Sequence, residues 1–196
     1  MKPEFSIRPA NSSDCLEIAK LYQISSSGVA DYIWSKLAED GDDLLDVGRR
    51  RYTRRNTNFS FENCWVVVTP GDLKEQIVAL LVAFPMHIDA GALEDDPVLQ
   101  PYSELEEDNS YYVCGVAVHR DYQGRGIGKC LMAKAQEDAQ TRGYCKISLL
   151  VFDQNTGAKR LYDDLGFEVI DSREVIPHPL IHYTGKVLLM VKSIPD

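Results

Sequence analysis

The sequence predicts an α/β (α+β) fold in which a mixed β-sheet carries helices on both faces. Residues 64–69 and 77–84 are two apolar runs separated by a Pro-Gly-Asp turn, a pattern typical of an antiparallel hairpin. Residues 111–118, 126–141 and 147–152 alternate as strand, helix and strand. The last of these strands has almost no polar face, which favours a parallel strand buried on both sides. Together these features predict one domain over residues 1–196.

The first elements follow from short-range patterns. Apolar and polar residues alternate over residues 5–9, as in a short strand. Residues 11–14 offer capping oxygens, and Cys15, Ile18, Ala19 and Tyr22 then recur at helical spacing on one expected buried face. A more polar helical stretch follows at residues 31–55, so that residues 11–55 form a helical region.

Two later helices and two strands complete the predicted fold. Residues 126–141 place Ile127, Leu131, Ala135 and Ala139 along one stripe. A second helix covers residues 156–165, and Gly166 is a suitable left-handed cap at its end. Residues 167–170 and 187–191 supply the last strands.

Composition excludes several classes of protein. The net charge of −9 argues against nucleic acid as a partner. No apolar run approaches the roughly 20 residues of a membrane span, and the first residues do not resemble a secretory signal, so we expect a cytoplasmic protein without membrane contact. The five cysteines contain no Cys-x-x-Cys pair and are expected to be buried free thiols. Prolines around His178 and His182 disfavour a helical metal site, and no metal is expected.

The negative charge is concentrated in residues 87–110. This segment contains 8 acidic residues and no lysine or arginine, together with glycine and prolines, and we interpret it as a long acidic loop insert. One hypothesis is that the insert attracts a cationic substrate. The alternative is a solvated loop without a specific role.

The chemistry is concentrated in a glycine-rich loop at residues 123–129. Three alternating glycines allow close backbone approach, and the positive end of the following helix favours an anion, so the loop predicts a diphosphate-binding site. It is not a P-loop, because Gln123 and Cys130 replace the required glycine and Ser or Thr. A tight turn without ligand is the alternative.

Two blocks of the sequence resemble the GNAT superfamily of acyl-CoA-dependent N-acyltransferases. Residues 116–128, Val-Ala-Val-His-Arg-Asp-Tyr-Gln-Gly-Arg-Gly-Ile-Gly, are similar to the acetyl-CoA motif of that family. Residues 155–167, Asn-Thr-Gly-Ala-Lys-Arg-Leu-Tyr-Asp-Asp-Leu-Gly-Phe, are similar to its next motif. The resemblance implies a single GNAT domain with a splayed sheet, in which residues 111–170 are the acetyl-CoA-binding core and residues 11–55 lie on the acceptor side.

The resemblance also implies a role for individual residues toward acetyl-CoA as cosubstrate. Loop amides would bind the pyrophosphate without a metal, and the strand before the loop would pair with the pantetheine arm. Arg125 and Lys129 have the alternative of exposed charges, and Asn155 that of a helix N-cap. The implied cofactor-binding residues are Val116, Ala117, Val118, Gln123, Gly124, Arg125, Gly126, Ile127, Gly128, Lys129 and Asn155.

The catalytic assignments are less direct. By resemblance, Tyr162 is the general acid that protonates the departing thiolate, with a core tyrosine as the alternative. The amine must lose a proton before it attacks, and Glu106, Glu107 and Asp108 are the candidate bases, of which we take Glu107. The alternative for all three is a solvated acidic loop.

The expected function is therefore N-acetyltransferase activity, with direct attack of a primary amine on acetyl-CoA in a ternary complex. We expect a small cationic amine as acceptor, with a protein N-terminal or lysine amine as the alternative. A rival of another class is a non-catalytic acyl-CoA-binding sensor. Homodimers are common in the resembling family, but the sequence does not define the oligomeric state.

Overall fold

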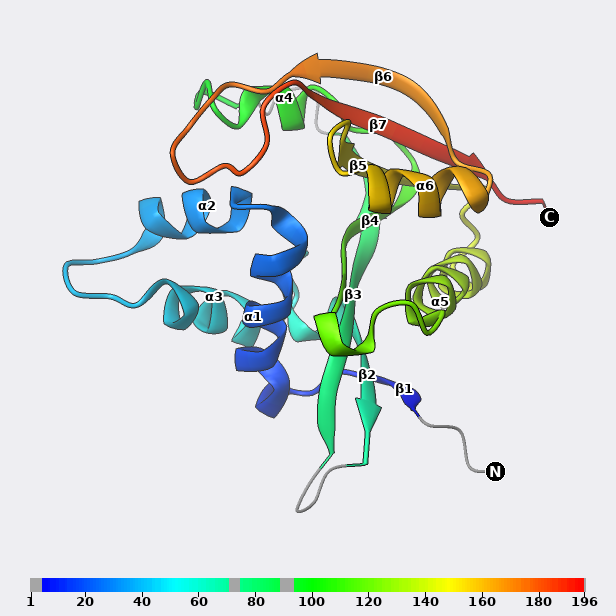
Figure 1. Cartoon of the computed structure of the whole chain (residues 1–196), viewed down its shortest axis with the longest axis horizontal. Helices are drawn as coiled ribbons and strands as arrows, with labels where there is room; N and C mark the ends of the chain where they lie inside the picture. Colours follow the sequence, from blue (N-terminus) through cyan, green and yellow to red (C-terminus); the bar gives the residue numbers. More distant parts are fainter. Residues whose placement is uncertain (1–4, 71–74, 89–93, 196) are drawn as a thin grey trace. The chain divides into compact units, whose positions relative to one another are not determined.

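The computed structural model describes residues 5–70, 75–88 and 94–195, which contain seven strands and six α-helices (Figure 1). The strands form one sheet in the order β1-β2-β3-β4-β5-β7-β6, with both parallel and antiparallel pairs. The predicted mixed α/β class is confirmed. The chain divides into two compact units, Met1–Val82 with Gly115–Leu131 and Ala83–Cys114 with Met132–Asp196. A single domain over residues 1–196 stays a prediction.

The first unit holds the N-terminal strands and helices. Its elements are β1 (Ser6–Pro9), α1 (Cys15–Ser26), α2 (Val29–Leu37), α3 (Leu44–Thr53), β2 (Cys64–Thr69), most of β3 (Gln76–Met86), the end of β4 (Ser110–Val118) and the start of α5 (Ile127–Thr141). β1 and β3 each pair antiparallel with β2, so the predicted hairpin is confirmed. Residues 71 and 72 of its predicted turn lie outside the described residues.

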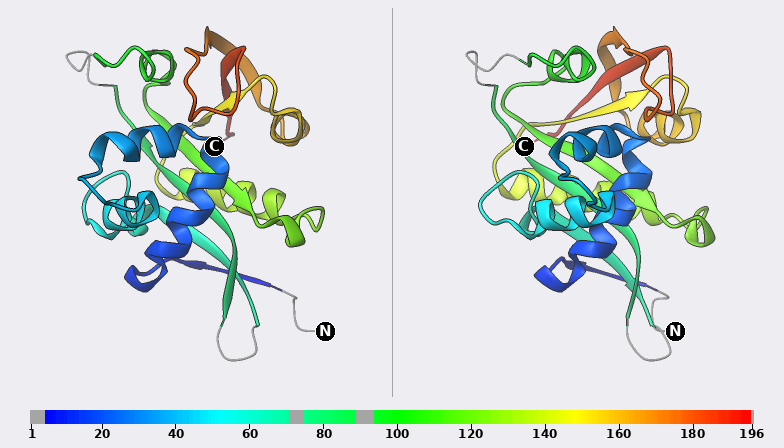
Figure 2. Two further views of the ribbon diagram at one scale, coloured as in Figure 1. Left: turned by 60° about the vertical axis from the view of Figure 1, so that its left-hand side comes forward. Right: turned by 90° about the vertical axis from the view of Figure 1, so that its left-hand side faces the viewer.

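The helices of the first unit begin where the sequence provides caps. Asn11 and Asp14 form a capping box, and Arg8 holds the Asp14 carboxylate at 2.7 Å before α1 starts. Ile18 and Ala19 are fully buried, whereas Tyr22 is only partly buried. Helices α1, α2 and α3 lie together on one side of the β2–β3 hairpin in both further views (Figure 2). The predicted helical region 11–55 thus consists of three helices.

Gly115 on β4 marks a close approach within the first unit. A Cβ atom at this position would lie 2.9 Å from Ser25 Oγ and 3.1 Å from the Tyr22 ring. Because Tyr22 and Ser25 both belong to α1, only glycine lets this helix pack directly on the strand.

The second unit contains the parallel pair and the C-terminal strands. Its elements are α4 (Gln100–Ser103), β5 (Lys146–Phe152), α6 (Thr156–Asp164), β6 (Glu168–Glu174) and β7 (Lys186–Ser193). β4 and β5 pair in parallel from Tyr111 with Ile147 to Val113 with Leu149, as predicted. β4 runs on to Val118 beyond the last of these pairs, and β7 pairs antiparallel with both β5 and β6.

Two predictions are corrected by the structure. The segment 87–110 is not one long loop, because α4 forms inside it, with Pro101 in the first turn, and Ser110 already belongs to β4. The prediction of buried thiols holds for Cys15 and Cys64 but is wrong for Cys130 and Cys145, which are exposed. Cys130 lies beside the buried Leu131 on α5 and faces outward, and Cys145 ends the turn before β5. No helix within the described ranges is long and apolar enough to cross a membrane.

Candidate functional site

The glycine-rich loop of the first unit is held in place from both ends. β4 ends at Val118, and the amide of His119 donates to the carbonyl oxygen of Val78 on β3 at 2.8 Å. One 3-10 turn, Arg120–Tyr122, follows and is closed by the Tyr122 amide, which donates to the His119 carbonyl at 2.8 Å. The loop therefore starts from a strand end that is fixed to its neighbour.

Two glycines give the loop its path. Gly124 and Gly126 have φ angles of +75° and +79°, in the left-handed region that L-residues with side chains rarely adopt. A Cβ atom at either position would meet nothing within 4 Å. The backbone angle, not lack of space, is therefore the reason for glycine here.

The loop leads directly into the N-terminus of α5. The first helical bond runs from the Cys130 amide to the Gly126 carbonyl at 3.1 Å. The amides of Ile127 and Gly128 precede that bond and donate no hydrogen bond within the described part of the chain. Unpaired amides at the positive end of a 15-residue helix are suited to an anion, and the diphosphate-binding role of the loop stays a prediction.

Two side chains of the loop, those of Gln123 and Arg125, have partners of their own. Gln123 Nε2 donates to the carbonyl oxygen of Val118 at 3.1 Å. The Arg125 guanidinium lies 5.1 Å from the Tyr122 ring centre and donates to the Asp121 carbonyl at 3.2 Å. Lys129 is exposed on the first turn of α5. The first unit thus brings together all the predicted cofactor residues except Asn155, namely Val116, Ala117, Val118, Gln123, Gly124, Arg125, Gly126, Ile127, Gly128 and Lys129.

The second unit carries Asn155 and Tyr162 at opposite ends of α6. Asn155 Oδ1 accepts from the Ala158 amide at 3.2 Å, so Asn155 is the helix N-cap, and its contact with a cofactor stays a prediction. Tyr162 is buried, and its ring centre lies 5.8 Å from that of Phe167. Burial raises the pKa of Tyr162 to about 12, which keeps the phenol protonated at neutral pH.

Tyr112 lies close to three other titratable side chains of the second unit. Burial raises the pKa of Tyr112 well above its usual value, and the charges of Cys114, Glu106 and Tyr162 act in the same direction. Tyr112 also shares a hydrogen bond with Cys114. Burial likewise raises the pKa of Glu106. Glu106 and the predicted acid, Tyr162, therefore both lie near Tyr112.

The sequence analysis did not identify Tyr112 and Cys114 as parts of the site. The signal was present, because residues two apart on a strand share a face, and both lie on β4 immediately before the predicted cofactor strand. Without the fold, the proximity of Tyr112 to Tyr162 could not be known.

The other two candidate bases have different surroundings. Glu107 forms an ion pair with Lys146 on β5. Asp108 Oδ1 accepts from the Ile88 amide at 2.9 Å, and this hydrogen bond lowers the pKa of Asp108. The role of Glu107 as base stays a prediction, but its carboxylate already has a cationic partner, whereas Glu106 is exposed and partial desolvation raises its pKa.

The described residues contain no group of three or more His, Cys, Asp or Glu side chains that could hold a metal ion. The arrangement as a whole provides an anion cradle on the first unit and, on the second, a buried phenol with a partly desolvated carboxylate. A cradle for a diphosphate and an acid–base pair are the elements that acyl transfer from a thioester requires.

Comparison with solved structures supports the fold. An N-acetyltransferase from Staphylococcus aureus Mu50 superposes with a TM-score of 0.63 at 18% identity, covering 95% of this chain and 100% of that one. A GNAT family acetyltransferase from Elizabethkingia anophelis, solved with acetyl-CoA bound, gives a TM-score of 0.58 at 15% identity and covers 98% of this chain and 100% of that one.

Comparison with curated sequences gives a shorter match. An acetyltransferase from Sodalis glossinidius is 36% identical over 63 residues, which are 32% of this chain and 42% of that protein. The match thus spans less than half the length of this relative. The model of the acetyltransferase (GNAT) family, by contrast, matches residues 32–167. Because this match includes most of the chain, with the glycine-rich loop and all of α6, the protein belongs to the GNAT acetyltransferase family.

Proposed function

We propose that this protein transfers an acetyl group from acetyl-CoA to a primary amine. The observation that carries the proposal is the loop between β4 and α5, where left-handed Gly124 and Gly126 precede the unpaired amides of Ile127 and Gly128. In a member of the GNAT family, the anion that fits this loop is the pyrophosphate of CoA.

The rest of the cosubstrate would extend along β4. The main chain of Val116, Ala117 and Val118 would pair with the pantetheine arm, as an added strand pairs with a sheet edge. The β4–β5 ladder has its last pair at Val113 and Leu149, which is consistent with an arm beside the later residues of β4. Asn155 would contact the same arm, in addition to capping α6.

The reaction needs a base and an acid, and the second unit offers both. The base must take a proton from an ammonium group with a pKa of about 10.4. We assign this step to Glu106, an exposed side chain whose pKa is raised by partial desolvation, which makes its carboxylate a better proton acceptor than an ordinary glutamate. Glu107, the base expected from the sequence, is ion-paired with Lys146 and is the second candidate.

Tyr162 would complete the reaction. The neutral amine attacks the thioester carbonyl, the C–S bond breaks, and the sulfur receives a proton from the phenol. The attacking nitrogen loses a proton, which restores the phenol, and the products are an N-acetyl amine and the free thiol of CoA. With its raised pKa, Tyr162 is protonated at neutral pH, as an acid must be before the C–S bond breaks.

The proposed acceptor is a small cationic amine, because the acidic segment 87–110 lacks lysine and arginine. Protein N-terminal and lysine amines are the alternative acceptors, and a sensor that binds acyl-CoA without catalysis is the alternative function. A cytoplasmic location and a homodimer stay predictions.

Two assays separate these alternatives. Calorimetric titration with acetyl-CoA tests binding, and release of free thiol across small amines and peptides tests transfer. Thiol release with a small amine supports the proposal. Binding without thiol release for any amine would leave the sensor, and absence of binding would remove both.

A further inference from the structure

Among the described residues of the second unit, two buried side-chain polar atoms have no hydrogen-bond partner. They are the hydroxyl oxygen of Tyr102, on α4, and Oδ1 of Asp153, directly after β5. Burial raises the pKa of Tyr102 to about 12, so its hydroxyl is neutral at physiological pH. Buried carboxylates and phenols in folded proteins are nearly always paired, and two unpaired ones call for an explanation.

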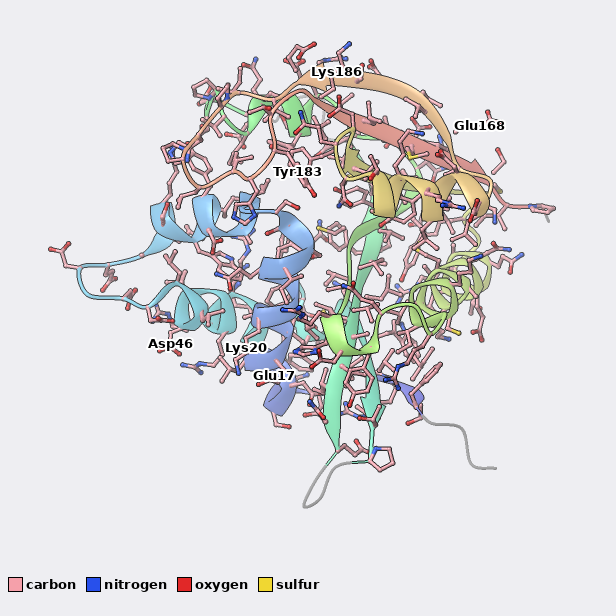
Figure 3. All side chains as sticks on the ribbon, in the orientation of Figure 1. Glu17, Lys20, Asp46, Glu168, Tyr183 and Lys186 are labelled. Carbon is pink, nitrogen blue, oxygen red and sulfur yellow. The ribbon has the colours of Figure 1, made fainter. Side chains whose placement is uncertain are left out.

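Three aromatic rings meet at the same end of β5. The Tyr102 ring centre lies 6.1 Å from that of Phe152, with the rings edge to face. The Tyr183 ring also contacts Phe152, at 5.1 Å between the ring centres. Tyr183 belongs to the segment that joins β6 to β7 (Figure 3). Phe152 is the last residue of β5, so these rings gather at the carboxyl end of a strand that is parallel to β4.

The unpaired carboxylate and two of the rings, those of Phe152 and Tyr183, are carried by the same two segments of chain. The Asp153 amide donates to the Lys186 carbonyl at 2.9 Å, and Gln154 Nε2 donates to Thr184 Oγ1 at 3.4 Å. A Cβ atom at Gly185 would lie only 3.0 Å from Asp153 Oδ1. Glycine at position 185 therefore leaves room for the carboxylate beside the segment that carries Tyr183.

We propose that Tyr102, Phe152, Asp153 and Tyr183 form a subsite for a second, non-reacting ammonium group of a diamine or polyamine acceptor. This inference rests on the proposed function and names its substrate class. An ammonium group donates three hydrogen bonds and accepts none, which suits a carboxylate oxygen and a phenol oxygen that lack partners. Aromatic faces attract the same charge.

The position in the fold supports this assignment. Ligands of sheets with parallel strands bind outside the carboxyl ends of those strands, and β5 ends at these residues. Tyr102 also lies within the segment 87–110, which has 8 acidic residues and no lysine or arginine, so the surrounding charge favours a cation.

The test compares two probes of equal length, 1,4-diaminobutane and 1-aminobutane, by thiol release. For the natural sequence we expect the diamine to have the higher kcat/KM. Asp153→Asn should lower the ratio of the two kcat/KM values at least tenfold, and Asp164→Asn, which removes an exposed carboxylate of α6, should leave the ratio unchanged. An unchanged ratio in Asp153→Asn would overturn the inference.

A binding measurement keeps this test separate from that of the proposed function. Calorimetry with 1,4-diaminobutane alone should show at least tenfold weaker binding to Asp153→Asn and to Tyr102→Phe than to the natural sequence. Tyr102→Phe removes only a hydroxyl without a partner, so the fold should persist, and circular dichroism checks this. If no amine releases thiol, the proposed function fails, while loss of diamine binding in these variants would still support the subsite. Equal diamine binding by all three proteins would overturn it.

Discussion

Replacement of Gly126 by alanine tests the loop with a single methyl group. The added Cβ meets nothing within 4 Å, so the substitution acts through the φ angle of +79° alone. Holding an L-residue with a side chain in this conformation costs roughly 1–2 kcal/mol. The loop can avoid this strain only by turning away from its present path, which would move the amides of Ile127 and Gly128.

The effect on acetyl-CoA follows from those two amides. A hydrogen bond to a charged group contributes about 1.5–3 kcal/mol, and loss of one such bond to the pyrophosphate weakens binding by roughly 10-fold to 150-fold. We therefore expect the Kd of Gly126→Ala for acetyl-CoA to rise within this range, as measured by calorimetry. Thermal unfolding of the variant measures the strain separately.

Gly143→Ala is the matched control. Gly143 has a φ angle of +78°, its added Cβ would also meet nothing within 4 Å, and it ends α5 instead of preceding it. The control should lose similar stability and keep its affinity for acetyl-CoA. If Gly126→Ala binds acetyl-CoA as tightly as Gly143→Ala does, the reasoning about the loop amides is refuted.

Four further predictions concern the second unit and the thiols. Tyr162→Phe should lower kcat about 100-fold or more, the usual contribution of a general acid, with the Kd for acetyl-CoA within a factor of two; unchanged turnover would remove the acid assignment. The rate of acetyl transfer should rise with pH through a pKa above that of an ordinary glutamate, and Glu106→Gln should abolish this rise. A rise that survives in the variant would exclude Glu106 as the base. Burial raises the pKa of Tyr111 to about 12 from about 10, so its contribution to stability is complete below pH 10 and is lost as the pH rises through 12. The free energy of unfolding of Tyr111→Phe, measured with urea, should therefore depend less on pH between these values than that of the natural sequence. An equal pH dependence of the two proteins would contradict the assignment. A thiol reagent should modify Cys130 and Cys145 in the folded protein ahead of the buried thiols, and equal rates for all cysteines would contradict the structure.

The sequence was sufficient where a single pattern determines a single element. The stripe on residues 127–139 predicted α5, because its apolar positions face one side and are buried in the structure. The alternating glycines predicted a loop with close backbone approach, and two of them, Gly124 and Gly126, have left-handed angles that few other residues adopt.

The sequence was insufficient where long-range contacts decide. β6 extends to Glu174, beyond the end at residue 170 that the sequence predicts. The prediction stopped short because the residues of β6 are mostly exposed and show no apolar–polar alternation. Adjacent glutamates at 106 and 107 look alike in sequence, yet one is partly desolvated and the other is paired with Lys146, 39 residues away. The contact of Phe152 with Tyr102 and Tyr183 joins three separate segments and leaves no local signal.

The most direct measurement of the central claim is a nitrogen-15 correlation spectrum recorded while acetyl-CoA is added. The account predicts that the amide protons of Ile127 and Gly128 move downfield as they begin to donate to phosphate oxygens, while the Gly143 amide, which already donates to Gln140, stays in place. Saturable binding that leaves the Ile127 and Gly128 signals unshifted would contradict it.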